Sequence, residues 1–342
     1  MRATAHGGII RRMRAIVQDR YGSPDVLSVQ DVPRPAPTEG QVLVRVRAAS
    51  VNARDWHAMR GDPYLARLAG GDVLGPRRPA QHIAGTDFAG EVVEVGRGVT
   101  RWSVGDEVFG EHVAAFAEYV CVPADRLAAR PATLSHEQAA ALPLAANTAL
   151  IGIRDIAAVQ PGQRVLINGA SGGVGLFAVQ LARSYGAHVT AVCRTRNIEL
   201  VQSAGAHDVI DYTRTDFARG GQRWEVVFDL VANRSLRDLR RAVTPTGILI
   251  LSGGGVSKGG SLFGPMGLVI RGTLVSRFAR HQRIQLLTAV PSRENLATLG
   301  ELAEKGVLTP VIDRSYPLEE TAEAIRYVET EHARAKVVLT VA

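Results

Sequence analysis

Apolar residues follow two different patterns in the first and later parts of the chain. From Met13 to about Pro131, short β-branched runs such as QVLVRVRAASVN, AGEVVEVG and AEYVCV are separated by Gly and Pro. Alternating runs of this length, broken by turn residues, are typical of half-buried strands. We therefore predict that the chain begins with an all-β unit, folded as a partly open β-barrel.

Helical periodicity replaces this pattern near Leu134, where SHEQAAALPLAANTALIGI begins. After Pro161, strand-like and helix-like segments alternate: RVLING, VGLFAVQLARSYG, HVTAVC, RNIELVQSAG and DVIDY, then EVVFDLV, SLRDLRRAV and GILILSG. Such alternation predicts an α/β unit with a doubly wound parallel sheet. The chain returns to a strand pattern in LTPVIDRSYPL and KVVLTV, so we expect its last part to rejoin the first unit.

These patterns divide the chain into three parts. Residues 1–12 show no clear periodicity and are expected to be a disordered tail. Residues 13–137 and 291–342 are expected to form the catalytic β unit, and residues 138–290 the dinucleotide-binding unit. A chain of 342 residues suits two domains of ordinary size.

Composition excludes several classes of protein. Cys121 and Cys193 are the only cysteines, too few for a disulfide framework or a thiolate zinc site. The net charge of +7 comes from scattered arginines, without a basic run interleaved with aromatic residues, so nucleic-acid binding is not expected. No apolar run approaches the roughly 20 residues that cross a bilayer. We expect a cytoplasmic enzyme without a membrane span.

The strongest local motif is NGASGGVG at residues 168–175, which lies between an apolar strand and a helix. Glycines at this spacing allow a tight turn, a close approach of the backbone to a pyrophosphate, and close packing of helix on strand. The helix N-terminus then faces the phosphates. In this setting the motif predicts dinucleotide binding. The residues expected to contact the cofactor here are Gly169, Ser171, Gly172, Gly173, Val174 and Gly175.

The segment after the second strand of this unit indicates which dinucleotide is bound. An Asp or Glu at this point would bind the ribose 2′-hydroxyl of NAD, but the sequence has Arg194, Thr195 and Arg196 instead. Two guanidinium groups and a hydroxyl suit a dianionic 2′-phosphate. We therefore expect NADPH as the cofactor. In the alternative interpretation, Thr195 caps the next helix and the arginines are solvated.

Several motifs together resemble the medium-chain dehydrogenase/reductases over nearly the whole chain from Met13. They are AASVNARDW, GTDFAGEVVEVG, WSVGDEVFG, the NGASGGVG turn and the closing HARAKVVLTV. Within that family the chain resembles the zinc-independent quinone oxidoreductase-like branch, including related enone reductases. The resemblance implies a GroES-like catalytic domain and a Rossmann domain.

The resemblance also bears on metal binding. The zinc-containing branch places cysteine and histidine ligands at positions that correspond to Asn52, Thr86 and Asn147 here. These residues lack the thiolate and imidazole groups that hold catalytic zinc tightly. We therefore expect no metal site.

For catalysis, the resemblance points to the SVN motif and the residues that follow it. Asn52 is expected to donate a hydrogen bond to a substrate carbonyl, and Asp55 to have a partly structural role. Tyr64 is a candidate proton donor, although a tyrosine in a Gly- and Pro-rich loop is as often a packing residue. Solvent is the alternative proton donor. Thr148 is expected to approach the nicotinamide.

Further cofactor contacts are implied elsewhere in the chain. Tyr212 is expected to contact the 2′-phosphate, Gly253 and Gly254 to let the backbone pass close to the nicotinamide ribose, and Lys336 to contact a phosphate or the ribose. Ala335 departs from the family, which commonly has glycine before this lysine.

The resulting hypothesis is an enzyme that transfers hydride from NADPH to a quinone or an α,β-unsaturated carbonyl without zinc. An enoyl-thioester reductase of a biosynthetic pathway, a catalytically silent NADPH-binding protein and a zinc alcohol dehydrogenase are the alternatives. Residues 256–281 are expected to cover the active site or meet a partner subunit. A homodimer is expected through the strand IQLLTAV at 284–290.

Overall fold

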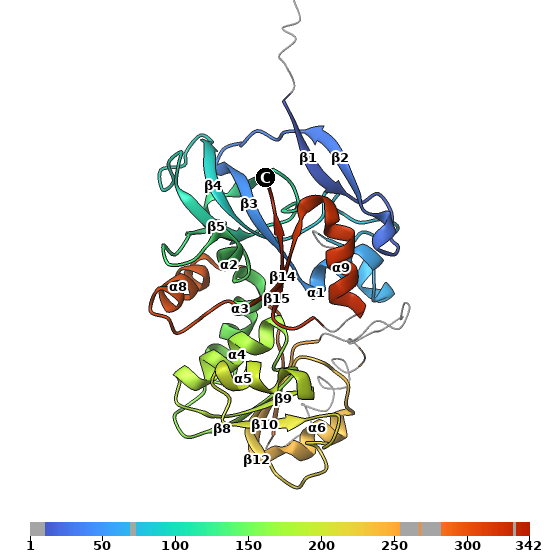
Figure 1. Cartoon of the computed structure of the whole chain (residues 1–342), viewed down its shortest axis with the longest axis vertical. Coiled ribbons are helices and arrows are strands. Elements are labelled where there is room, and N and C mark those ends of the chain that lie inside the picture. Colours follow the sequence, from blue (N-terminus) through green and yellow to red (C-terminus); the bar gives the residue numbers. More distant parts are fainter. Residues whose placement is uncertain (1–10, 69–72, 254–266, 268–281, 331–332) are drawn as a thin grey trace, which may run out of the picture.

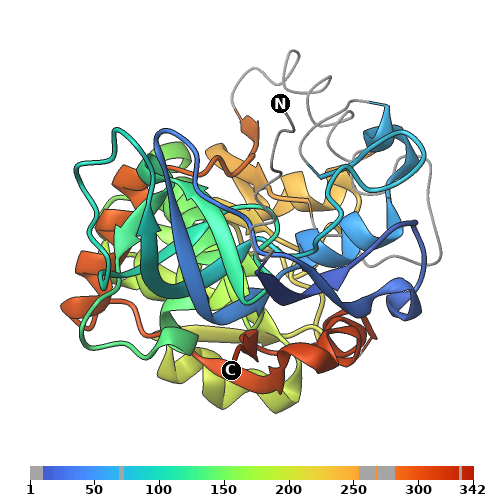
Figure 2. The same ribbon diagram turned by 90° about the horizontal axis from the view of Figure 1, so that it is seen from above.

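The computed structural model of the chain describes residues 11–68, 73–253, 267, 282–330 and 333–342. Two units are stacked along the long axis, with a mainly antiparallel sheet at one end and a parallel sheet at the other (Figure 1). Seen from above, the first sheet lies in front of the second unit (Figure 2).

The first unit is built on a sheet in the order β14-β15-β3-β4-β5-β7, with β6 also paired to β3. Valine side chains of the long central strand β3 are fully buried, because elements cover both of its faces. A separate hairpin-like pair, β1 and β2, packs beside this sheet. The strands are β1 Arg12–Val17, β2 Ser28–Pro33, β3 Gln41–Val51, β4 Asp87–Val95, β5 Glu107–Glu111, β6 Tyr119–Pro123, β7 Leu127–Ala129, β14 Ile312–Pro317 and β15 Lys336–Thr340.

Strand β15 brings the end of the chain back to the first unit. It runs antiparallel to β3, with Val337 opposite Val51, and parallel to β14 on its other side. Its start also touches the second unit, because Ala335 forms an isolated bridge with Gly172. Residues just before and within β15 therefore contact both units at once. The boundaries at 138 and 291 remain proposals.

The second unit contains a six-stranded parallel sheet in the order β10-β9-β8-β11-β12-β13. The prediction of a doubly wound parallel sheet is confirmed. The chain order reverses between β8 and β11, and in such sheets ligands bind at the carboxyl ends of the strands beside this reversal. The strands are β8 Arg164–Asn168, β9 His188–Cys193, β10 Asp208–Asp211, β11 Trp224–Asp229, β12 Val243–Leu251 and β13 Arg283–Leu286.

Helices cover the sheets and join the two units. Helix α9 packs on β14, β15 and α1, whereas α3 packs on α4 and so lies where the units meet. The helices are α1 Ala53–Arg60, α2 His136–Ala140, α3 Pro143–Leu150, α4 Gly173–Ser184, α5 Ile198–Ser203, α6 Leu236–Ala242, α8 Arg293–Glu304 and α9 Thr321–Thr330. Short single turns are η1 Pro24–Val26, η2 Tyr64–Arg67, η3 Ala124–Arg126, η5 Thr195–Asn197 and η6 Leu318–Glu320, and η4 Ile151–Ile156 is a π-helical turn.

The Ala-rich stretch from Ser135 to Ile153 forms three helical pieces instead of one helix. Helix α2 ends at Ala140 and Pro143 begins α3, because a proline has no N–H to continue the preceding helix. The stretch closes in the π-helical turn. Over the described part of the chain, no helix is both long and apolar enough to pass through a membrane.

Candidate active site

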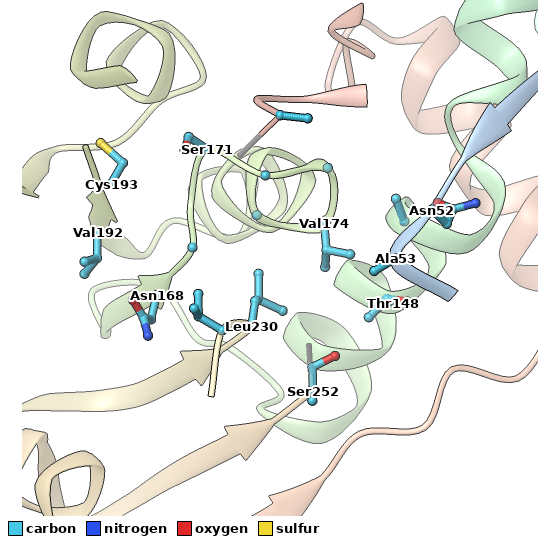
Figure 3. Close-up of a pocket in the computed structure, with 18 of the residues that line it drawn as sticks. Asn52, Ala53, Thr148, Asn168, Ser171, Val174, Val192, Cys193, Leu230 and Ser252 are labelled. Carbon is cyan, nitrogen blue, oxygen red and sulfur yellow. The ribbon is translucent and has the colours of Figure 1, made fainter. Parts of the chain in front are cut away.

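A cavity of about 750 Å³ runs along the carboxyl ends of the parallel strands and on to α1 of the first unit. Figure 3 shows Val192 and Cys193 at one end, Asn52 and Thr148 at the other, and Ser171 between them. The residues predicted from the sequence that line it are Asn52, Thr148, Gly169, Ser171, Gly172, Gly173, Val174, Gly175, Arg194, Arg196, Tyr212 and Gly253. Gly254 and residues 256–281, except residue 267, lie outside the described residues.

The glycine-rich turn forms one wall of this cavity. Gly169 has a φ of +88°, a conformation that glycine adopts without strain. A Cβ on Gly175 would lie 2.2 Å from the carbonyl oxygen of Gly169, so only glycine lets α4 pack this closely on the turn. Helix α4 begins at Gly173 and its N-terminus faces the cavity, an arrangement that suits a pyrophosphate.

At the far end of the cavity, Arg194 and Tyr212 form a polar pair. Arg194 Nε donates a hydrogen bond of 2.6 Å to the Tyr212 hydroxyl, and Arg196 also lines the wall. Thr195 does not line the cavity, and it is not the cap of a helix, because Arg194 occupies the N-cap of η5. Its hydroxyl donates to Asp211 at the end of β10. Sequence reasoning missed Asp211, whose pKa is lowered mainly by the hydrogen bonds from Thr195 and Thr213.

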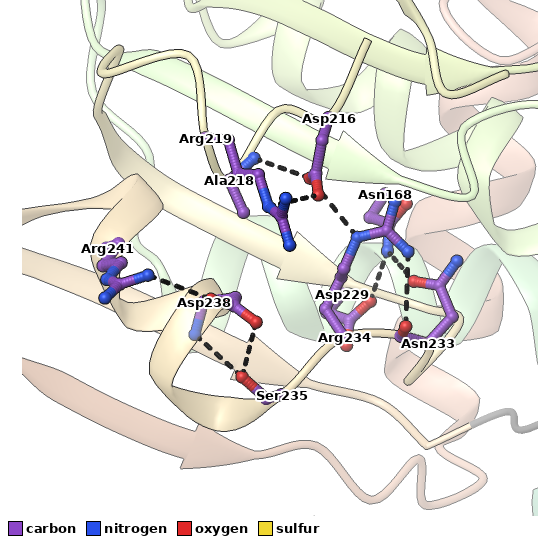
Figure 4. Close-up of polar contacts among 10 residues, drawn as sticks. All are labelled: Asn168, Asp216, Ala218, Arg219, Asp229, Asn233, Arg234, Ser235, Asp238 and Arg241. Carbon is purple, nitrogen blue, oxygen red and sulfur yellow. Dashed lines mark hydrogen bonds and ion pairs between the residues drawn. The ribbon is translucent and has the colours of Figure 1, made fainter. Parts of the chain in front are cut away.

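Figure 4 shows the buried Asn168 and Asp229 joined to the exposed Asn233 in a cluster of amide and carboxylate groups. Asp229 Oδ1 accepts a hydrogen bond of 2.7 Å from Asn168 Nδ2, which also lies 3.2 Å from Asn233 Oδ1. Burial raises the pKa of Asp229, and its second oxygen has no partner among the described residues. Asn168 and Asn233 both line the cavity, so this cluster fixes two amides at its wall.

The other end of the cavity approaches α3. The Thr148 hydroxyl donates a hydrogen bond of 2.7 Å to the Leu144 carbonyl, and both residues line the cavity. The Leu144 N–H in turn faces the Asp87 carboxylate, 3.2 and 3.3 Å from its two oxygens. A carboxylate here satisfies an N–H of the first turn of α3 and interacts well with the helix dipole. Asp87 therefore fixes the helix that carries Thr148.

Asn52 and Lys336 meet beneath this end of the cavity. Lys336 is 3% exposed, and its Nζ donates a hydrogen bond of 2.5 Å to Asn52 Oδ1 and lies 3.9 Å from Asp87 Oδ2. The Asn52 side-chain nitrogen donates a hydrogen bond of 3.3 Å to the Ser50 carbonyl oxygen. The Asn52 amide is thus held by buried groups, and Lys336 does not line the cavity.

Three buried carboxyl groups share this region with Lys336. Asp55 Oδ2 accepts a hydrogen bond of 2.7 Å from the Asn52 N–H, and Asp55 does not line the cavity. Burial raises the pKa values of Asp55 and Glu111 to about 7 each, and burial also raises the pKa of Asp87. Burial lowers the pKa of Lys336, against the attraction of these carboxylates. Close to neutral pH, the region therefore holds more acidic groups than it can keep charged.

Arg54 and His57 line the cavity beside Asn52, and sequence reasoning missed both. They lie three positions apart on α1, so their side chains share one face of the helix, and that spacing after the SVN motif was an available signal. Tyr64 lies elsewhere: it does not line the cavity, its side chain is 45% exposed, and the Arg67 guanidinium covers its ring at 4.6 Å.

Family models match two parts of the chain. Residues 38–132 match the alcohol dehydrogenase GroES-like domain, and residues 204–339 match a domain described as zinc-binding dehydrogenase. The chain is 31% identical to a chloroplastic quinone-oxidoreductase homolog of Spinacia oleracea, over 96% of this chain and 98% of that protein. It is 30% identical to a chloroplastic NADPH-dependent alkenal/one oxidoreductase of Arabidopsis thaliana, over 98% of this chain and 81% of that protein.

The fold is also that of a known oxidoreductase. The structure of the quinone oxidoreductase from Coxiella burnetii aligns with a TM-score of 0.81 and 31% identity, over 97% of this chain and all of that one. The chain belongs to the medium-chain dehydrogenase/reductase superfamily, in its quinone oxidoreductase-like branch. The predicted family and the predicted fold, a GroES-like domain with a Rossmann domain, are confirmed.

Other medium-chain dehydrogenases bind zinc, so the donor groups here have to be tested for fit. Asn52 Oδ1 accepts from the Lys336 ammonium, a cation that would repel a metal ion. Asn147 uses its Nδ2 to bind the Val290 carbonyl at 2.9 Å and its Oδ1 to accept from Asn295 at 2.8 Å. Asn and Thr side chains engaged in this way do not fit a catalytic zinc ion.

The groups that line the cavity do fit a dinucleotide. The cavity offers a glycine turn in which a Cβ on Gly169 or Gly175 would clash, a helix N-terminus, and arginines where the sequence predicts a phosphate. Asn197 donates a hydrogen bond of 2.9 Å to Ser171 and leaves its own buried oxygen without a partner among the described residues. That oxygen can accept a hydrogen bond only from a group outside the described chain.

Proposed function

We propose that this medium-chain reductase transfers hydride from NADPH to a quinone or an α,β-unsaturated carbonyl without zinc. The observation that carries the proposal is one continuous cavity. It joins the glycine turn and the Arg194–Tyr212 pair to a second chamber lined by Asn52, Arg54 and Thr148. The residues at the first end would hold a nicotinamide cofactor, and those at the second end would hold the acceptor beside it.

NADPH supplies the hydride when it is bound, and the chain supplies the binding and orientation. The N-terminus of α4 and the turn around Gly172 hold the pyrophosphate, and Arg194 with Tyr212 binds the 2′-phosphate. We assign Thr148 and Gly253 to the nicotinamide end. The names of the Spinacia and Arabidopsis relatives support a quinone or an alkenal or enone as acceptor, and the second supports NADPH.

The roles of the residues around the acceptor follow from their contacts. Asn52 forms part of the chamber wall, with its amide held by Lys336 and the Ser50 carbonyl. Because Tyr64 does not line the cavity, we assign the proton to solvent. The acceptor gains one hydride from NADPH and one proton from water, which balances its two-electron reduction.

Two other predictions also remain proposals. Strand β13 is an edge of the parallel sheet and pairs only with β12 among the described strands, which leaves its other side for a second copy. We therefore keep the homodimer through residues 284–290. We also propose that the protein is located in the cytoplasm.

The test uses the purified chain with NADPH and a panel of one quinone, one enone and one enoyl thioester. NADPH consumption with the quinone or enone is expected to persist after dialysis against a zinc chelator, and mass spectrometry is expected to find no stoichiometric zinc. Turnover confined to the thioester would favour an enoyl-thioester reductase. NADPH binding without turnover on any acceptor would contradict an enzymatic role, and loss of activity on chelation would contradict zinc independence.

A further inference from the structure

Reduction of a carbonyl acceptor places negative charge on its oxygen, and the site needs a donor aimed at that oxygen. The two donors expected from the sequence, Asn52 and Tyr64, are not suited to this, and neither is the nearby hydroxyl of Thr148. Tyr64 lies off the cavity, the Asn52 amide is held by Lys336 and the Ser50 carbonyl, and the Thr148 hydroxyl donates to Leu144. The chamber therefore needs another group to stabilise the charge.

Arg54 has the required position and chemistry. It is the second residue of α1, its side chain lines the chamber, and that side chain is 38% exposed. Its Nη1 donates a hydrogen bond of 2.7 Å to Glu111 Oε1 at the end of β5. A guanidinium carries five N–H donors in a rigid plane, so this single bond leaves several donors for a ligand.

Glu111 holds Arg54 from the buried side. Its side chain is only 4% exposed, so the carboxyl group is fixed within the fold while the guanidinium it binds reaches the chamber. Burial is the main cause that raises the pKa of Glu111 to about 7, and the nearby carboxylates of Asp87 and Asp55 raise it further. Close to neutral pH the charge of Arg54 is therefore only partly cancelled by its partner.

We propose that Arg54 is a catalytic residue that donates hydrogen bonds to the acceptor's carbonyl oxygen as negative charge develops there, and that Glu111 is its positioning residue. This inference rests on the proposed reduction of a carbonyl acceptor. The donor is already oriented by Glu111, so little reorganisation is needed when the charge appears, and this favours the transition state over the ground state.

The first test compares Arg54→Met and Arg54→Lys with the unchanged protein. Arg54→Met removes the donors but keeps an apolar chain, and kcat/KM for the accepted quinone or enone should fall by about 100-fold. Arg54→Lys keeps the charge and should recover part of the loss. The Kd for NADPH, measured by fluorescence without acceptor, should stay the same. Arg97→Met is the matched control, because Arg97 also pairs with one glutamate, Glu39, but lies on the exposed surface.

The second test does not depend on turnover. The probe is 4-nitrophenol, whose ionised form absorbs visible light and resembles the charged acceptor oxygen. With NADP⁺ present, the unchanged protein should bind the phenolate in preference to the phenol, seen as a lowered apparent pKa of the bound probe. Arg54→Met should abolish this preference, and Glu111→Gln, which keeps the accepting oxygen, should retain most of it.

The outcomes separate the two proposals. If no acceptor is reduced but Arg54→Met still abolishes phenolate binding, the proposed function fails and the assignment of Arg54 as the anion donor stands. If Arg54→Met keeps full activity and phenolate preference, the assignment is overturned. A weakened Kd for NADPH that accounts for the whole loss would make Arg54 a cofactor contact instead. Loss of the phenolate preference in His57→Gln but not in Arg54→Met would identify His57 as the donor.

Discussion

The two ends of the cavity are built in opposite ways. The cofactor end uses short segments of one sheet, and its charged groups, such as Arg194, sit at the cavity wall. The substrate end draws Asn52, Asp87, Glu111 and Lys336 from four different strands or strand ends, and all four are buried. Changes at the first end should therefore alter binding, whereas changes beneath the second should alter the stability of the whole fold.

Lys336→Met should have the largest effect, and it tests directly whether the buried charges beneath the substrate end stabilise the fold. It would leave Asp87, which is fully buried, without its cation and Asn52 Oδ1 without its donor. Loss of one partner of a buried charge pair destabilises by about 3–5 kcal/mol, and we expect such a loss in urea unfolding of the cofactor-free protein. Adding Asp87→Asn should recover a large part.

Lys305→Met is the control, because Lys305 is 68% exposed and lies 3.8 Å from Glu301 on the surface. It should change the unfolding free energy by less than about 0.5 kcal/mol. Equal stability of Lys336→Met and Lys305→Met would show that the buried charges do not support the fold.

Asp55→Asn tests the same comparison through the pH dependence of the unfolding free energy. The pKa of Asp55 is raised from 3.8 to about 7, so between these values the folded chain keeps a proton that the unfolded chain has lost. This contribution to stability is complete below about pH 4 and disappears as the pH rises towards 7. The unfolding free energy of the unchanged protein should therefore fall relative to that of Asp55→Asn by on the order of 3 kcal/mol across this window. A constant difference between the two proteins in urea titrations would contradict the assignment.

Arg194→Ala tests the cofactor end, where only binding should respond. Loss of a hydrogen bond from a charged donor is worth about 2 kcal/mol, so the ratio of kcat/KM for NADPH to that for NADH should fall about 30-fold. Urea unfolding without cofactor should stay within about 0.5 kcal/mol of the unchanged protein. Arg219→Ala, at an 82% exposed arginine paired with Asp216, should leave the ratio unaltered. An unaltered ratio in Arg194→Ala would remove the main support for NADPH.

Ala335→Gly has the smallest expected effect, at a residue that lies where the two units of the fold meet. Ala335 has a φ of +56°, which is unfavourable for a residue with a Cβ. Glycine relieves this strain but loses more entropy on folding, and the net gain should be about 0.5 kcal/mol. Ala128→Gly, in the buried strand β7, should instead destabilise by about 1 kcal/mol. Equal losses in the two variants would show that position 335 carries no strain.

The same contrast explains which features the sequence predicted. The turn from Gly169 to Gly175 was predictable because its spacing, strand and helix lie next to each other in the chain. The parallel sheet followed from alternating segments for the same reason. At the substrate end, the motif after β3 located the site, but the partners of Asn52 depend on the register of β15 against β3.

Three placements show what local sequence patterns cannot predict. The contact of Lys336 with Asn52 results from the pairing of distant strands that no spacing rule describes. Tyr64 does not line the cavity, and the Arg67 guanidinium lies over its exposed ring. Asp211 reaches Thr195 because β10 pairs with β9, although 16 positions separate them.

The Asn52–Lys336 hydrogen bond also has a consequence for the order of folding. It closes a loop of 284 positions, whereas the bond from the Gly172 N–H to the Gly169 carbonyl spans only three. Contacts between residues far apart in the chain carry a larger loop-closure entropy and form later than local ones. During folding, the chain therefore acquires a turn able to hold a nucleotide before it has any chamber in which to reduce a substrate.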